Sequence, residues 1–267
     1  MTSMLIRPLV AALLLAAPAL ARAQPLDARV ASARGSVGFE FATRPNVCGN
    51  GMSINISDDT SPGWTTRRNR SGIQMGRSTG EDRVCEQGPA RVVLQHSGAT
   101  VTGAGVTVGG RDTRADTELG VVAPAEAARY LLAIAPKLAG RSADEAVMGA
   151  AIADAPSSWR RMLAIARAND ASESSRKSSL FWVSQEASGI ATAGLTDIAM
   201  DDANGGSVRS DALFYLAQRR DGEGIPSLIR VVRESKSAKL RKDAIFHLSQ
   251  SNDPRALDLF EALLAGR

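Results

Sequence analysis

The hydrophobic positions of the chain change their period partway along the sequence. Between Gly35 and Gly110, short phrases such as "GSVGFEFAT", "MSINISD" and "ARVVLQHSG" alternate apolar and polar residues between Gly, Asn, Asp and Pro. This pattern is typical of β-strands joined by turns. From Ala123 onward the apolar spacing is that of helices. We therefore predict an α+β chain, with a small β-rich domain at 24–120 and an all-α domain at 121–267.

One helical phrase occurs three times in the second half. It reads "SRKSSLFWVSQ", "VRSDALFYLAQ" and "LRKDAIFHLSQ", and its arginines Arg176, Arg209 and Arg241 are 33 and 32 residues apart. Stacked helical repeats use periods in this range, because one hairpin cannot bury its apolar stripe alone. We expect each phrase to be the first helix of a repeat, ending at Gln185, Gln218 or Gln250.

The phrase also predicts which side chains enter the core. Two equivalent sets of residues form the expected stripe, Ala212, Leu213 and Leu216 in one phrase and Ala244, Ile245 and Leu248 in the next. Ser179 stands where these phrases have Ala212 and Ala244, and such small residues permit close helix approach. Pro124 and the pair Asp253–Pro254 mark helix starts.

The first 23 residues are typical of a secretory signal peptide. Arg7 is followed by an apolar run from Pro8 to Leu20 and by the triplet Ala21-Arg22-Ala23. We predict a signal peptide at 1–23 with cleavage before Gln24, no transmembrane segment after its removal, and a periplasmic or secreted protein.

Charge adds little evidence for a polyanionic partner. Removal of Arg7 and Arg22 lowers the net charge from +4 to +2, so nucleic acid is not an expected partner. The polar stretch 57–80 is predicted to be a long loop. A group of arginines in and beside this stretch is expected to be solvated: Arg67, Arg68, Arg70, Arg77 and Arg83.

The two cysteines, Cys48 and Cys85, are predicted to form a disulfide, because an even pair in an exported chain meets an oxidising compartment. Closing this loop stabilises a domain by about 4 kcal/mol. Metal binding is the rival explanation. We expect no metal, because His96 and His247 are the only histidines and neither lies at a ligand spacing from a cysteine.

The phrases together resemble a known family. The segments "RPNVCGNG", "CEQGPARVVL", "VTVGG", "APAEAARYLLAIA" and "ADEAVMGAAIAD", with the three repeated phrases, are similar to HEAT-repeat proteins. More narrowly, they resemble secreted bacterial proteins that join a small cysteine-containing β-rich segment to a HEAT-like α-solenoid. This resemblance implies protein–protein scaffolding and names no catalytic residue. The first phrase departs from the pattern, with Ser178 and Ser179 where later phrases have Asp and Ala.

Candidate chemistry is sparse in the sequence. His247 lies near Ser249 and Asp243, but it occupies the place of Trp182 and Tyr215 in the repeat, which favours a packing role. The string "GATVTGAGVTVGG" lacks the Lys-Ser/Thr of a phosphate-binding loop and is expected to form a hairpin. We expect no catalytic residues and no cofactor.

These observations lead to a functional prediction with two alternatives. The prediction is an exported, non-enzymatic scaffold that binds a protein or peptide through its helical repeats. In "IPSLIRVVRE" the expected core residues leave Arg230 and Arg233 outward as candidate partner-binding residues; those core residues are Ile225, Leu228, Ile229 and Val232. One alternative is an enzyme similar to HEAT-like chromophore lyases, and the other is small-ligand binding by the β-rich domain.

Overall fold

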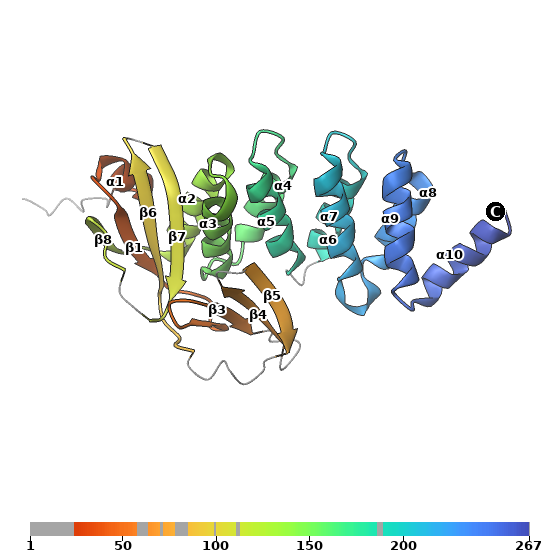
Figure 1. Cartoon of the computed structure of the whole chain (residues 1–267), viewed down its shortest axis with the longest axis horizontal. Helices are drawn as coiled ribbons and strands as arrows, with labels where there is room; N and C mark the ends of the chain where they lie inside the picture. The colour runs from red at the N-terminus through yellow and green to blue at the C-terminus, as the bar shows by residue number, and fades with distance from the viewer. Residues whose placement is uncertain are drawn as a thin grey trace, which may run out of the picture.

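The computed structural model describes residues 24–57, 64–69, 72–77, 85–98, 100–110, 113–185 and 189–266, and the signal peptide predicted at 1–23 lies outside them. The chain is mixed α and β (Figure 1). The strands are β1 Val37–Phe41, β2 Val47–Gly49, β3 Ile54–Ser57, β4 Trp64–Asn69, β5 Gly72–Arg77, β6 Ala90–Ser97, β7 Thr100–Val108 and β8 Thr117–Val121. The α-helices are α1 Leu26–Ser32, α2 Pro124–Ile134, α3 Gly140–Ile152, α4 Ser158–Arg167, α5 Glu173–Ser184, α6 Gly189–Met200, α7 Gly206–Ala217, α8 Ile225–Glu234, α9 Ala238–Ser249 and α10 Pro254–Leu264.

The first sheet has four strands in the order β7-β6-β1-β8. β1 pairs antiparallel with β6 and parallel with β8. The glycine-rich string does not form a hairpin by itself: it contains the single strand β7, which pairs antiparallel with β6. Val37, Phe39 and Phe41 of β1 are fully buried. Their spacing of two places them on one face of the sheet, as the alternating phrase predicts.

A second sheet has the order β2-β3-β4-β5, and each neighbouring pair is antiparallel. Its last two strands correct the expectation of a loop at 57–80, because residues 64–69 and 72–77 pair with each other and 64–69 also pairs with β3. Backbone pairing with β3 therefore orders a stretch whose polar composition suggested a loop. Of the arginines expected in that loop, Arg67 and Arg68 belong to β4 and Arg77 to β5, while Arg70 and Arg83 lie outside the described residues.

The helices after β8 form a row of antiparallel pairs that leads away from the first sheet (Figure 1). The closely packed pairs are α2 with α3, α4 with α5, α6 with α7 and α8 with α9, and α10 packs against α8. We call α5, α7 and α9, which contain the repeated phrases, the phrase helices, and α4, α6, α8 and α10 the back helices. The phrase helices contact one another in sequence along the row.

This packing changes how the repeats are divided. Each phrase was expected to be the first helix of its repeat, but each phrase helix packs most extensively against the back helix that precedes it. The phrase helix is therefore the second member of its pair, and α10 stands at the end without a following phrase helix among the described residues. A sequence period is the same wherever the repeat is cut, so the period alone could not identify the pairs.

The first sheet and the helical row share one boundary. α3 packs against β7, and Glu145 of α3 is buried there, accepting a hydrogen bond from the Val106 backbone N–H at 3.2 Å. The connection after β1 also pairs with the end of α3, since the Arg44 N–H donates to the Ile152 carbonyl oxygen at 2.9 Å. The sheet thus covers the N-terminal end of the row (Figure 1).

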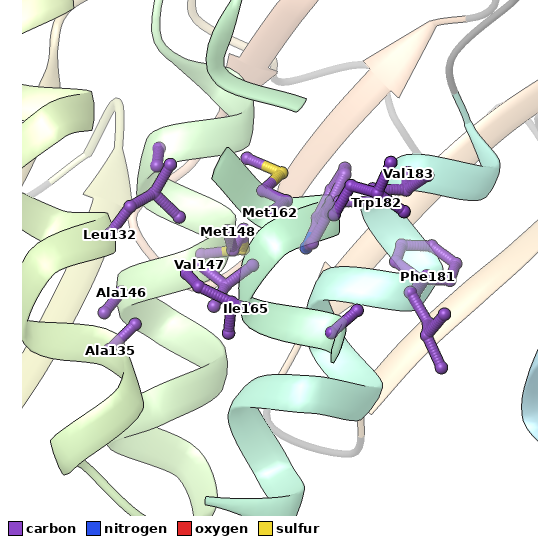
Figure 2. Packing of buried hydrophobic residues seen from close by; sticks show 14 of the residues in the cluster. Leu132, Ala135, Ala146, Val147, Met148, Met162, Ile165, Phe181, Trp182 and Val183 are labelled. Carbon is purple, nitrogen blue, oxygen red and sulfur yellow. The ribbon is translucent and has the colours of Figure 1, made fainter. Parts of the chain in front are cut away.

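The buried apolar side chains of both regions belong to one cluster. Figure 2 shows part of it, where Val147 and Met148 of α3 gather with Met162 and Ile165 of α4. Two core expectations need correction: Val231 is buried in α8 while Ile229 is only partly buried, and Ile245 of α9 is 38 % exposed. The remaining residues of the predicted stripe are buried: Ala212, Leu213, Leu216, Ala244 and Leu248.

Candidate interaction site

The arginine that opens each phrase binds the end of the preceding back helix. Arg176 Nε donates to the Ala166 carbonyl oxygen at 3.1 Å, and Arg209 Nε donates to the Ala199 carbonyl oxygen at 2.9 Å. Arg241 does the same through Nη1 to the carbonyl oxygen of Ser235, which follows α8, at 2.7 Å. Helix C-termini leave carbonyl groups without intrahelical partners and carry partial negative charge, so a guanidinium stabilises them. This contact explains why the phrase recurs with its arginine.

Six ring side chains form a continuous row along the phrase helices. In order they are Trp182, Phe181, Tyr215, Phe214, His247 and Phe246, and successive ring centroids lie 4.9, 6.1, 5.4, 6.2 and 5.6 Å apart. All five contacts are edge-on, the geometry that aromatic rings prefer. We call these six residues the ring row. It joins α5 to α7 and α7 to α9.

The ring row becomes more exposed toward the C-terminal end. Phe181 is buried, whereas Phe214 is 43 % exposed and Phe246 is 61 % exposed. These three residues occupy the same place in their phrases. Large apolar side chains that lie together at a surface are typical of protein interaction sites.

His247 lies within the ring row, in agreement with the packing role predicted for it. Its ring contacts Phe214 and Phe246, while the Ser249 hydroxyl donates to the Phe246 carbonyl oxygen at 2.8 Å. Burial lowers the pKa of His247, although the nearby Asp243 carboxylate acts in the opposite direction. The Ser249 hydroxyl is therefore directed to the backbone and not to the imidazole. His96, the other histidine, lies in β6 near its end, also as expected.

Polar contacts also join successive phrase helices. Lys177 Nζ of α5 lies 3.8 Å from Asp211 Oδ2 of α7, and the Ser210 hydroxyl of α7 donates to Asp243 Oδ2 of α9 at 3.1 Å. Burial raises the pKa of Asp211 despite the Lys177 ammonium beside it. In α5 and in α7, the residue after the arginine therefore contacts an aspartate of the next phrase helix.

The predicted partner-binding arginines are both exposed on α8. Arg230 Nε forms an ion pair with Glu234 Oε2 at 2.8 Å, which raises the pKa of the guanidinium. Their outward direction agrees with the expected helix phase. Their role in binding stays a prediction.

The structure contains the expected disulfide between Cys48 and Cys85. The bridge encloses β3, β4 and β5, and beside it Gly49 and Glu86 exchange two backbone hydrogen bonds of 3.0 and 2.8 Å. Gly49 has no room for a side chain, since a Cβ atom there would lie 2.2 Å from the Val108 carbonyl oxygen. β2 of the second sheet is therefore joined covalently to the segment that precedes β6, and its backbone closely approaches β7 of the first sheet. A disulfide fits an oxidising compartment.

A small cleft lies where the connection after β1 meets the helical row. Arg44, Trp159, Met162, Trp182 and Gln185 are among its lining residues. Its water-accessible volume is about 30 Å³, enough for roughly two water molecules. The cleft begins beside the buried end of the ring row.

No group of three or more His, Cys, Asp or Glu in the described ranges is placed to hold a metal ion. Among the helices that the structure describes, none combines the length and apolar character needed to cross a membrane.

No protein-family model, no curated protein and no solved structure matches this chain.

Two features of this site were missed from the sequence. Phe181, Phe214 and Phe246 recur in the phrases, yet the predicted packing position included only the residue that follows each of them. The recurring phenylalanine beside a second ring was the available signal for the ring row. The carbonyl contacts of the arginines had no such signal, because they depend on how the helices pair.

Proposed function

We propose that this protein is an exported, non-enzymatic scaffold whose HEAT-like α-solenoid binds a protein or peptide partner. The observation that carries the proposal is the ring row, which is buried at Phe181 and emerges at Phe214 and Phe246. Exposed aromatic side chains held by edge contacts have little conformational freedom to lose on binding, and such residues dominate interaction energies.

The repeated contacts support the solenoid interpretation. The same arginine-to-carbonyl bond occurs at Arg176, Arg209 and Arg241, and the phrase helices contact each other in sequence order. Contacts between neighbouring repeats are what define a solenoid, and such arrays use their long faces for recognition. The predicted signal peptide and the disulfide support export.

The surroundings of His247 support a structural role for the one histidine in a repeated phrase. Its ring packs between two phenylalanines, and Asp243 is held by Lys239 Nζ at 2.8 Å and by the Ser210 hydroxyl. The cleft near Trp182 has space for about two waters, far less than a chromophore requires. Neither feature favours the lyase alternative.

An affinity capture from envelope extracts tests the proposal. The bait is the mature protein, compared with a Phe214→Ser variant, an Arg230→Glu/Arg233→Glu variant, and the matched charge reversal Arg161→Glu on α4, whose arginine is also exposed. We expect one partner to bind the wild type and Arg161→Glu and to be reduced in one or both test variants. The partner is then purified and its affinity measured.

Two outcomes would contradict parts of the proposal. Equal affinity for wild type and the double arginine variant would remove Arg230 and Arg233 from the site. Absence of any saturable protein partner, combined with turnover of an added substrate that His247→Tyr abolishes, would replace the scaffold with an enzyme.

A further inference from the structure

The end of the helical row leaves one helix position open. α7 lies against α5 and α6, and α9 lies against α7 and α8. At the C-terminal end, α9 and α10 both pack against α8, and no described helix lies beyond them (Figure 1). We call the place beside α9 and α10, where a next phrase helix would lie, the open position.

Equivalent side chains show that this surface has the character of an internal interface. Leu180, Leu213 and Ile245 share one place in the phrases; Leu180 and Leu213 are 0 % exposed, whereas Ile245 is 38 % exposed. Phe246 is likewise more exposed than its equivalents. Three further leucines of α10 are exposed at this end: Leu257, Leu263 and Leu264. The apolar positions that neighbours cover in earlier layers are thus uncovered in the last one.

α9 also carries a donor at the position that makes the polar contact between phrase helices, but no described phrase helix follows it to supply the aspartate. Lys242 stands one residue after its arginine, where Lys177 and Ser210 stand in the earlier phrases. Both of those residues contact an aspartate of the following phrase helix, Asp211 and Asp243 respectively. Lys242 is exposed on α9. The last phrase helix therefore presents a cation and a phenylalanine four residues apart, as α5 does with Lys177 and Phe181.

The inner layers define what fits such a surface. Asp211 of α7 contacts Lys177 of α5. Tyr215, four residues after Asp211, contacts Phe181. At the same spacing, Asp243 of α9 contacts Ser210 of α7, and His247 contacts Phe214. Residues four apart lie on one helix face, so the two contacts are made by one side of one helix.

We propose that the open position binds a helix of a partner protein that carries an acidic residue and, four residues later, an aromatic ring. The carboxylate pairs with Lys242 and the ring packs edge-on against Phe246. This inference rests on the proposed scaffold function and names the chemistry of one partner surface. An amphipathic helix that docks on an exposed apolar surface is an established mode of protein recognition.

In the described part of the chain, a second copy does not present such a helix. The pairs Asp211 with Tyr215 and Asp243 with His247 are engaged inside the row. In α2, Tyr130 lies four residues after Glu126 but is buried. The first sheet covers the opposite end of the row, so a head-to-tail copy could not extend it. These observations favour a helix from a different protein over one from a second copy.

A labelled peptide tests the inference directly. The probe is a hydrocarbon-stapled, fluorescent peptide with the sequence of residues 206–218, which contains Asp211 and Tyr215, and binding to the full mature protein is followed by anisotropy. We expect saturable binding that weakens about tenfold in Lys242→Glu and about thirtyfold in Phe246→Ser. Lys236→Glu reverses an exposed lysine before α9 and should leave affinity unchanged.

Charge exchange makes the test specific. The peptide with Asp211→Lys should bind wild type weakly and recover affinity for Lys242→Glu, while the peptide with Tyr215→Ser should be weak with both. Circular dichroism shows that each protein variant is folded. Failure of the wild-type peptide to saturate, or equal affinity for wild type, Lys242→Glu and Phe246→Ser, would overturn the inference.

The remaining outcomes separate this inference from the broader function. A dimer in light scattering that Phe246→Ser dissociates would assign the open position to a second copy and overturn the partner-helix proposal. A captured partner that binds Phe246→Ser normally but loses affinity for Arg230→Glu/Arg233→Glu would also overturn it, while leaving the scaffold function intact.

Discussion

Contacts within the β-rich region join residues that are far apart in the sequence, whereas contacts within the helical row join residues about one repeat apart. In the first sheet, β1 pairs with β8 through partners such as Val37 and Thr117, which are 80 residues apart. In the row, phrase helices contact the next layer over about one repeat, as between Ser210 and Asp243, 33 residues apart. Long-range pairing must close large loops before it contributes, whereas repeat contacts form between neighbours. A destabilising substitution should therefore lower the stability of the sheets as a whole, whereas in the row its effect should decrease from layer to layer.

The largest expected effect concerns the covalent closure of the β-rich region. The Cys48→Ser/Cys85→Ser variant should lose about 4 kcal/mol of unfolding free energy, because the bridge closes a loop with a sequence separation of 37. Urea unfolding followed by strand circular dichroism measures the loss. Intact-mass analysis with and without reductant provides the control. A loss below about 1 kcal/mol, or two alkylatable thiols in native protein, would contradict this account.

A core substitution in the row should have the next largest effect. Leu216 is buried in α7, and Leu216→Ala should cost about 3 kcal/mol through lost burial and a residual cavity. Leu264→Ala is the matched control, because Leu264 is exposed and should change stability by less than about 0.5 kcal/mol. Equal effects of the two variants in chemical denaturation would show that the helix phase is wrong.

Substitution of Glu145, at the boundary between the first sheet and the helical row, should lower the stability of the protein. Glu145→Ala leaves the Val106 N–H without its acceptor and removes the ion pair with Arg141 at 3.1 Å, so a loss of about 2 kcal/mol is expected. Glu145→Gln keeps an acceptor oxygen and should lose less. Thermal melts of both variants measure this difference. Indistinguishable melting temperatures would mean that the carboxylate does not join α3 to β7.

The smallest effect is expected at His247. His247→Tyr keeps a flat ring in the row and should cost less than about 1.5 kcal/mol, whereas His247→Ala should cost more. Because burial depresses the folded-state pKa of His247, the unfolded state binds a proton more readily. Stability should therefore be fully present above pH of about 6.5 and fall as the pH drops below it. This pH dependence should be reduced in His247→Tyr. Unfolding free energies measured at several pH values test the prediction, and a stability that rises as the pH falls would contradict it.

Local signals in the sequence predicted the helical row best. Gln185, Gln218 and Gln250 directly follow their phrase helices, and Asp253 accepts from the Arg255 N–H at 2.9 Å as a cap before Pro254. Caps, proline positions and apolar stripes act within a few residues, so one sequence is enough to identify them.

Features that depend on distant partners could not be predicted in the same way. Residues 64–69 and 72–77 form strands because β3 provides an edge, which their polar composition does not indicate. The exposure of Ile245 follows from the absence of a covering helix in the described part of the row, although its equivalents Leu180 and Leu213 are buried. The ring row required knowledge of which helices are neighbours.

Hydrogen exchange of wild type and Leu216→Ala tests the central claim most directly, because it reports local stability along the chain. If the row is stabilised layer by layer, exchange should accelerate most in α7, less in α5 and α9, and least in β1 and β6. In the wild type, α9 and α10 at the uncovered end should exchange faster than α5. An equal increase in every strand and helix, or an increase confined to α7 alone, would contradict the account.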